Sequence, residues 1–168
     1  MRHLLQIIDS DFCKKCKDCC RFHPECINFS PVFINKDKDY IINELGFNKN
    51  LFFKKKTDEW TVKFKKKQGK YLLCPFLKDE RCAAQEIKPF NCLLYPVILM
   101  RSKDNKKIVV ALDESCKAIK QNKILVPLGE YIENLKKYFK SEKIIKKIKE
   151  LPSHVEPYQG EYKIIFEL

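Results

Sequence analysis

Apolar residues recur at helical spacing near the C-terminal end of the sequence. Between residues 127 and 151 they return every three or four positions, which predicts a helical segment with one buried face. Ser141 is expected to break or re-cap this segment, and Pro152 to end it. The apolar positions are Leu128, Tyr131, Ile132, Leu135, Tyr138, Phe139, Ile144, Ile145, Ile148 and Leu151.

Alternation of apolar and polar residues predicts β-strands in the middle of the chain. Residues 60–65 alternate in this way and are expected to pair with residues 71–74 across a turn of Lys, Gln and Gly. Residues 96–101 and 107–112 predict a second hairpin, and residues 162–166 a last strand.

A shorter helix is predicted over residues 36–45. Asn35 is expected to cap its start and Gly46 to end it. One further helical turn is expected at residues 83–87. The fold class that follows is α+β: a small single domain with a cysteine-cluster loop, two β-hairpins and a long C-terminal helical segment.

The domain organisation follows from length and glycine content. A chain of 168 residues with four glycines suits one domain without a flexible linker. We therefore expect one domain over residues 1–168, in which the helical segment 127–151 packs on a cysteine-rich metal-binding region, residues 13–120.

The number and clustering of the cysteines are the strongest functional signal in the sequence. Four of the nine fall within eight residues, in the run Cys13-x2-Cys16-x2-Cys19-Cys20, and we expect an irregular loop over residues 13–27. One buried cysteine serves a core as a small apolar residue, but four adjacent thiols do not have that explanation. The other cysteines are Cys26, Cys74, Cys82, Cys92 and Cys116.

Disulfides and metal binding are the two interpretations of so many cysteines. A secreted disulfide framework normally has an even number of cysteines behind a signal peptide. Here the number is odd, and the apolar run at residues 4–8 is short and followed by Asp9. The sequence therefore favours a cytoplasmic protein with metal-bound thiolates. No apolar run reaches the length of a membrane span, so we expect no membrane association.

Eight cysteines are the candidate metal ligands. A C-x2-C pair lets two sulfurs reach one ion, as in structural zinc sites, and the repeated x2 spacing also begins an iron–sulfur run that Cys74-Pro75 could close. Cys19 and Cys20 diverge and so serve two sites or two metals of one cluster, which suggests two sets of four. Zinc and an iron–sulfur cluster both stay open as the cofactor. The candidates are Cys13, Cys16, Cys19, Cys20, Cys74, Cys82, Cys92 and Cys116.

The remaining candidates have weaker signals. Cys26 is expected to be a buried packing residue, with a ligand role second. A lone histidine beside a cysteine cluster, such as His23, more often donates a hydrogen bond to a metal ligand or lies on the surface than binds the metal itself. His3 and His154 carry no signal.

An ordered set of motifs resembles the YkgJ-type cysteine-cluster family. That family is described as a zinc- or iron-chelating domain and is similar to a region of flagellin lysine N-methylases. The resemblance covers residues 13–120 and implies the eight-cysteine ligand set. It is carried by Cys13-x2-Cys16-x2-Cys19-Cys20, by Cys74-Pro75-Phe76-Leu77, by Cys82-x3-Glu86-x2-Pro89-x2-Cys92-x3-Pro96, and by Cys116.

The chain departs from the family pattern next to these ligands. Ala84-Gln85 stands where Ile-Tyr is frequent, Lys88 where Arg precedes the proline, and Leu93 where Arg follows the cysteine. The ligands are intact, but lysine cannot reproduce the bidentate contact of arginine. The large extra region of the methylases is missing, so we do not expect a complete methyltransferase.

The net charge of +12 indicates which kinds of partner the chain could attract. It permits attraction to nucleic acid or another polyanion, although only four basic residues are the arginines that readers of bases favour. Besides a metal ion, the expected partners therefore include a protein and, with less support, nucleic acid.

Three functions are consistent with these patterns. The first is metal binding by the clustered cysteines, with an unknown downstream role. The second is an iron–sulfur redox or accessory protein for a protein modification that resembles lysine methylation. The third is a basic nucleic-acid-binding adaptor. The sequence has no Gly-rich phosphate loop, H-E-x-x-H or Ser/His/Asp signature, which argues against a stand-alone enzyme.

Overall fold

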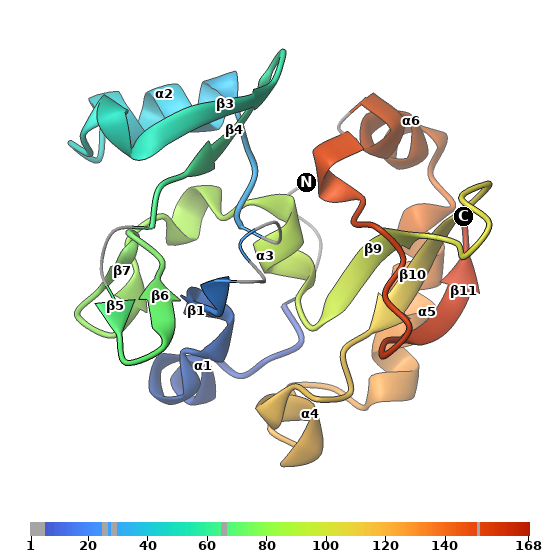
Figure 1. Ribbon diagram of the computed structural model, residues 1–168. Coiled ribbons are helices and arrows are strands. Elements are labelled where there is room, and N and C mark those ends of the chain that lie inside the picture. The colour runs from blue at the N-terminus through green and yellow to red at the C-terminus, as the bar shows by residue number, and fades with distance from the viewer. Residues whose placement is uncertain (1–5, 25–26, 28–29, 65–66, 151) are drawn as a thin grey trace. The chain divides into compact units, whose positions relative to one another are not determined.

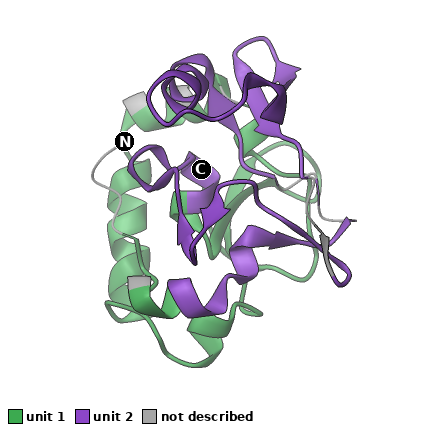
Figure 2. Ribbon diagram, turned by 90° about the vertical axis from the view of Figure 1, so that its left-hand side faces the viewer, with its two compact units in different colours: residues 1–13, 93–168 green, residues 14–92 purple. Residues whose placement is uncertain are grey.

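The computed structural model describes residues 6–24, 27, 30–64, 67–150 and 152–168 of the chain. The chain divides into two compact units: unit 1 comprises residues 1–13 and 93–168, and unit 2 comprises residues 14–92. Figure 2 shows the two units in different colours. Helices and antiparallel sheets occur together, which confirms the α+β class. The single domain, and the packing of residues 127–151 on the cysteine-rich region, stay predictions.

Unit 1 contains a three-stranded antiparallel sheet in the order β11-β10-β9 (Figure 1). Its strands are β9 (Val97–Arg101), β10 (Ile108–Leu112) and β11 (Lys163–Glu167). Val110 pairs with Leu99 and Leu112 with Val97, which confirms the predicted hairpin; the predicted last strand completes the sheet. Both faces of β10 are buried because it is the central strand.

The predicted C-terminal helical segment forms two helices in unit 1. They are α5 (Leu128–Phe139) and α6 (Glu142–Glu150). Ser141 separates them as expected, and its carbonyl accepts hydrogen bonds from Ile144 and Ile145 at 2.9 and 3.0 Å. The face of α5 with Tyr131, Leu135 and Phe139 is buried. Short helices α4 (Lys117–Lys120) and η5 (Pro152–His154) flank them.

Unit 2 has a three-stranded sheet in the order β2-β4-β3, with helix α2 beside it (Figure 1). Their bounds are β2 (Phe33–Ile34), α2 (Asn35–Asn43), β3 (Phe52–Lys56) and β4 (Glu59–Val62), with the 3-10 turn η3 (Lys49–Leu51) before β3. The first predicted hairpin is wrong in its pairing. Residues 60–62 pair with β3 and β2 instead of residues 71–73.

The predicted helix over 36–45 is confirmed within two residues of its bounds, but its cap is different. Ile34 is the N-cap, and Asn35 is the first helical residue. The Asn35 side chain instead donates to Asp58 and accepts from the Trp60 ring nitrogen, at 2.8 and 2.6 Å. Gly46 turns the chain after the helix with a φ of 67°.

A second sheet in unit 2 has the order β1-β6-β5. Its short strands are β1 (Arg21–Phe22), β5 (Lys67–Gln68) and β6 (Tyr71–Leu73), and a separate hairpin joins β7 (Leu77–Lys78) to β8 (Arg81–Cys82). The predicted turn at 83–87 is present as η4 (Gln85–Ile87), and α3 (Phe90–Leu94) follows.

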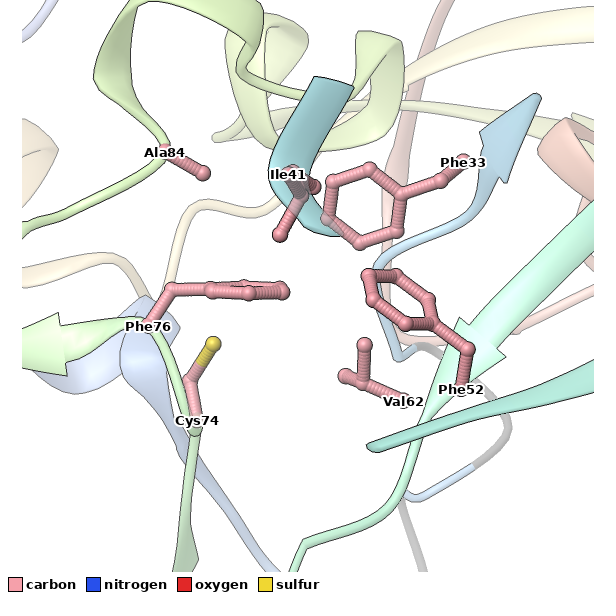
Figure 3. Close-up of a cluster of buried hydrophobic side chains, with 7 residues drawn as sticks. All are labelled: Phe33, Ile41, Phe52, Val62, Cys74, Phe76 and Ala84. Carbon is pink, nitrogen blue, oxygen red and sulfur yellow. The ribbon is translucent and has the colours of Figure 1, made fainter. Parts of the chain in front are cut away.

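Aromatic rings form the core of unit 2 (Figure 3). The Phe76 ring lies 5.4 Å from Phe33 and 6.1 Å from Phe52, measured between ring centroids. In Figure 3 the side chain of Cys74 extends toward Phe76, so one candidate ligand belongs to this core. The other members are Ile41, Val62 and Ala84.

No helix in the described ranges has both the length and the apolar character needed to cross a membrane.

Candidate metal centre

The first two cysteines of the cluster lie on a helix. Helix α1 (Ser10–Cys16) begins where the Asp9 carboxylate accepts hydrogen bonds from the backbone of Asp11 and Phe12, at 3.0 and 2.8 Å. Cys13 and Cys16 are three residues apart and therefore share one side of α1. The expectation of an irregular loop over residues 13–27 is wrong for this part.

The next two cysteines lie beside β6. Lys17 has a left-handed φ of 57°, which ends α1, and the turn η1 (Asp18–Cys20) leads into β1. The Cys20 carbonyl then accepts a hydrogen bond from the Cys74 backbone at 2.9 Å, next to the pairing of Arg21 with Leu73. Main-chain hydrogen bonding thus brings the end of the cluster to Cys74.

The β7–β8 hairpin positions Cys82. Cys82 pairs with Leu77 across the hairpin. At the turn, Asp79 and Glu80 have left-handed φ values of 44° and 65°, and Glu80 forms an ion pair with Lys17. This ion pair connects the turn with the cysteine run, and the sequence had no signal for it because 63 residues separate the partners.

Two buried thiols of unit 2, those of Cys74 and Cys92, have pKa values that neighbouring thiols raise. Burial raises the pKa of Cys74 to about 12, and the thiols of Cys82 and Cys19 raise it as well. Burial also raises the pKa of Cys92 well above its usual value, and Cys74, Cys19 and Cys82 add to the increase. We call Cys19, Cys74, Cys82 and Cys92 the four-thiol group.

Several groups around these sulfurs favour their charged form. Backbone hydrogen bonds from Phe76 and Leu77 lower the pKa of Cys74, although burial outweighs them. The ammonium group of Lys88 likewise lowers the pKa of Cys92. Metal-bound thiolates accept such hydrogen bonds, so the surroundings of Cys74 suit a ligand.

The donor chemistry fits zinc or an iron–sulfur cluster. In the described residues the eight cysteines are thiols and form no disulfide. Sulfur-only sets of four are typical of both cofactors. The side chains are not arranged as a closed site, however: among described residues no group of three or more His, Cys, Asp and Glu could hold a metal ion.

The other four predicted ligands are not part of the four-thiol group. Cys20 packs against the aromatic core of unit 2, and Cys16 is partly buried. Cys13 and Cys116 belong to unit 1, so their participation with the four-thiol group stays a prediction. Cys26, predicted as a packing residue, and His3 lie outside the described residues.

Asp113 holds the turn that leads to Cys116 in unit 1. The Cys116 backbone donates to the Asp113 carbonyl at 3.2 Å, and the Asp113 carboxylate accepts from Ser115 and from the Tyr95 hydroxyl, at 2.9 and 3.0 Å. Cys116 is buried at the start of α4. An Asp-x-Ser-Cys sequence is compatible with such a turn, but the contribution of Tyr95 could not be read from it.

The two described histidines also have defined positions. The His23 ring meets the edge of Tyr71 at 6.4 Å between ring centroids. His154 is buried in unit 1, a placement that the sequence did not signal.

Comparisons with protein-family models, with curated proteins and with solved structures find no match to this chain.

Proposed function

We propose that this is a metal-binding protein whose clustered cysteines chelate zinc or an iron–sulfur cluster. The observation that carries the proposal is the four-thiol group, in which Cys19 lies within the electrostatic reach of Cys74 and Cys92, two cysteines at least 55 residues later in the chain. The resemblance to the YkgJ-type cysteine-cluster family supports the same function.

Electrostatics explains why a metal suits the four-thiol group. Buried thiolates repel one another, so without a cation the sulfurs of Cys74 and Cys92 keep their protons, as their raised pKa values indicate. A bound cation supplies the positive charge that lets several thiolates lie together. Loss of the proton from Cys74 on metal binding is assisted by backbone N–H groups that favour its thiolate.

Binding energy gives the second argument. Structural zinc contributes about 10–16 kcal/mol in small peptide sites, which is comparable with the stability of a whole domain at about 5–15 kcal/mol. All strands of unit 2 except β3 have two to four residues, and we propose that ligation by the four-thiol group stabilises this unit and closes the site. Cys13, Cys16, Cys20 and Cys116 also stay proposed ligands, as the resemblance to the cysteine-cluster family implies.

The proposed cellular location follows from the need to keep the thiols reduced. A reducing cytoplasm keeps so many cysteines as thiols available to metal, and we propose that location. An iron–sulfur cluster would favour the redox or accessory function, whereas zinc would favour a structural one.

The test is anaerobic purification of the full chain, with metal and acid-labile sulfide analysis. We expect stoichiometric zinc in a colourless protein, or iron with sulfide in a brown one. Replacing Cys74 or Cys92 by serine should remove at least one metal equivalent, because each belongs to the four-thiol group.

The matched control is Cys26→Ser, which removes a thiol that is not a proposed ligand and should leave the metal content unchanged. A folded chain that contains neither metal, or metal content that Cys74→Ser and Cys92→Ser both leave intact, would overturn the proposal.

A further inference from the structure

The positive charge of the chain is concentrated in one segment. Residues 49–70 contain nine lysines against two acidic residues, which is +7 of the total net charge of +12. One of the two acids, Glu59, is buried in β4 with 2% of its surface exposed. In the part of this segment whose burial the structure describes, six lysines are exposed against one exposed acid, Asp58.

Strand β3 exposes the densest part of this charge. It is an edge strand of the β2-β4-β3 sheet (Figure 1). Lys54, Lys55 and Lys56 are all exposed, while Phe52 anchors the strand in the core. The register of β3 against β4 shifts between Lys54 and Lys56, and such a bulge interrupts the regular alternation of side chains between the two faces of the sheet. Charged residues also protect an edge strand from pairing with other chains, which is the competing explanation.

An exposed aromatic ring lies within the same strand. Phe53 is 44% exposed and directly precedes the three lysines. A protein that binds single-stranded nucleic acid without reading its sequence combines cations for the phosphates with aromatic rings on which bases stack. Residues 49–70 contain no arginine, which argues against bidentate reading of bases in a duplex.

We propose that Phe53, Lys54, Lys55 and Lys56, which we call the β3 basic edge, bind single-stranded nucleic acid with little sequence preference. The lysines contact phosphates, and the Phe53 ring stacks on a base. This function is independent of the metal proposal, since none of the four residues belongs to the candidate ligands.

The test measures binding of the purified, metal-loaded chain to fluorescent oligothymidine and oligouridine by anisotropy at several salt concentrations. Replacing Lys54, Lys55 and Lys56 together by glutamine should weaken binding strongly at low salt. Three lost phosphate contacts should also reduce the slope of log affinity against log salt by about 2, given about 0.7 per contact on single strands.

The control variant replaces Lys103, Lys106 and Lys123, which are exposed in unit 1, and removes the same charge. It should retain most of the affinity and the salt slope. Equal losses in the two triple variants would mean that only net charge matters, and would overturn the proposal.

Phe53→Ala separates a single strand from other polyanions. It should lower affinity for oligothymidine about tenfold, in line with about 1–3 kcal/mol for stacking one base, and leave the salt slope unchanged. Duplex DNA, heparin and phosphatidylserine vesicles serve as competitors. Unaltered binding by Phe53→Ala, or a preference for any of these competitors over the oligonucleotides, would contradict the proposal. Matching metal content and melting temperature confirm that each variant is folded.

Discussion

Tyr131 is buried on α5, yet its hydroxyl makes no hydrogen bond within the described residues. A buried hydroxyl without a partner costs about 1–3 kcal/mol relative to water. We therefore expect Tyr131→Phe to raise the free energy of unfolding by about 1 kcal/mol, as measured by urea denaturation. Tyr158→Phe, at a residue 39% exposed, is the control and should change little. A clear loss of stability in Tyr131→Phe would show that the hydroxyl has a partner.

Tyr131 should also make the free energy of unfolding depend on pH. Burial raises the pKa of Tyr131 from 10.0 to about 12. The folded chain therefore holds this proton more tightly than the unfolded chain, and the resulting stability is fully present below pH 10 and lost as the pH rises toward 12. Wild type should thus lose stability relative to Tyr131→Phe over this range. Parallel denaturation curves at each pH would contradict the expectation.

At the scale of elements, two glycines should respond oppositely to the same substitution. Gly46 follows α2 with a φ of 67°, whereas Gly129 lies in the first turn of α5; an added methyl group meets nothing within 4 Å at either. Gly46→Ala should lower the free energy of unfolding by about 1–2 kcal/mol because of backbone strain. Gly129→Ala should raise it by about 0.5–1 kcal/mol. Thermal melts test both, and equal shifts would exclude a conformational cause.

Local patterns predicted some elements well. The β9–β10 hairpin, α5 and the break at Ser141 follow from neighbouring residues, and all were predictable. The partner of β4 was not, because β3 has a single buried residue, Phe52, before a run of lysines and so lacks alternation. The clustered thiols also obscured α1, although Asp9 is a usable N-cap signal.

Local sequence patterns likewise predicted only part of the candidate site. Motif spacing predicted that the cysteines form a set of ligands, which stays a prediction, but which of them lie near one another depends on the pairing of β1 with β6 and on the position of α3. Both arise from tertiary structure. The supporting groups, such as Lys88 and the Glu80–Lys17 ion pair, come from distant or unremarkable positions and had no sequence signal.

At the scale of the whole molecule, metal removal should affect the two units unequally. The four-thiol group lies in unit 2, and its Cys74 belongs to the aromatic core there. Chelation should therefore lower amide hydrogen-exchange protection in α2 and β4 more than in β9 and β10. Mass spectrometry of exchanged peptides measures this. Cys26→Ser, treated in the same way, should match the wild type, and uniform loss across both units would argue against local stabilisation.

The order of strands in the unit 1 sheet has a consequence for synthesis. β10 lies at the centre, but β11 is translated only after α5 and α6. Until then the apolar strand β10 has an open side that can recruit a strand from another nascent chain. Ribosome-bound or prematurely terminated products that stop before Lys163 are therefore expected to need chaperones and to aggregate without them.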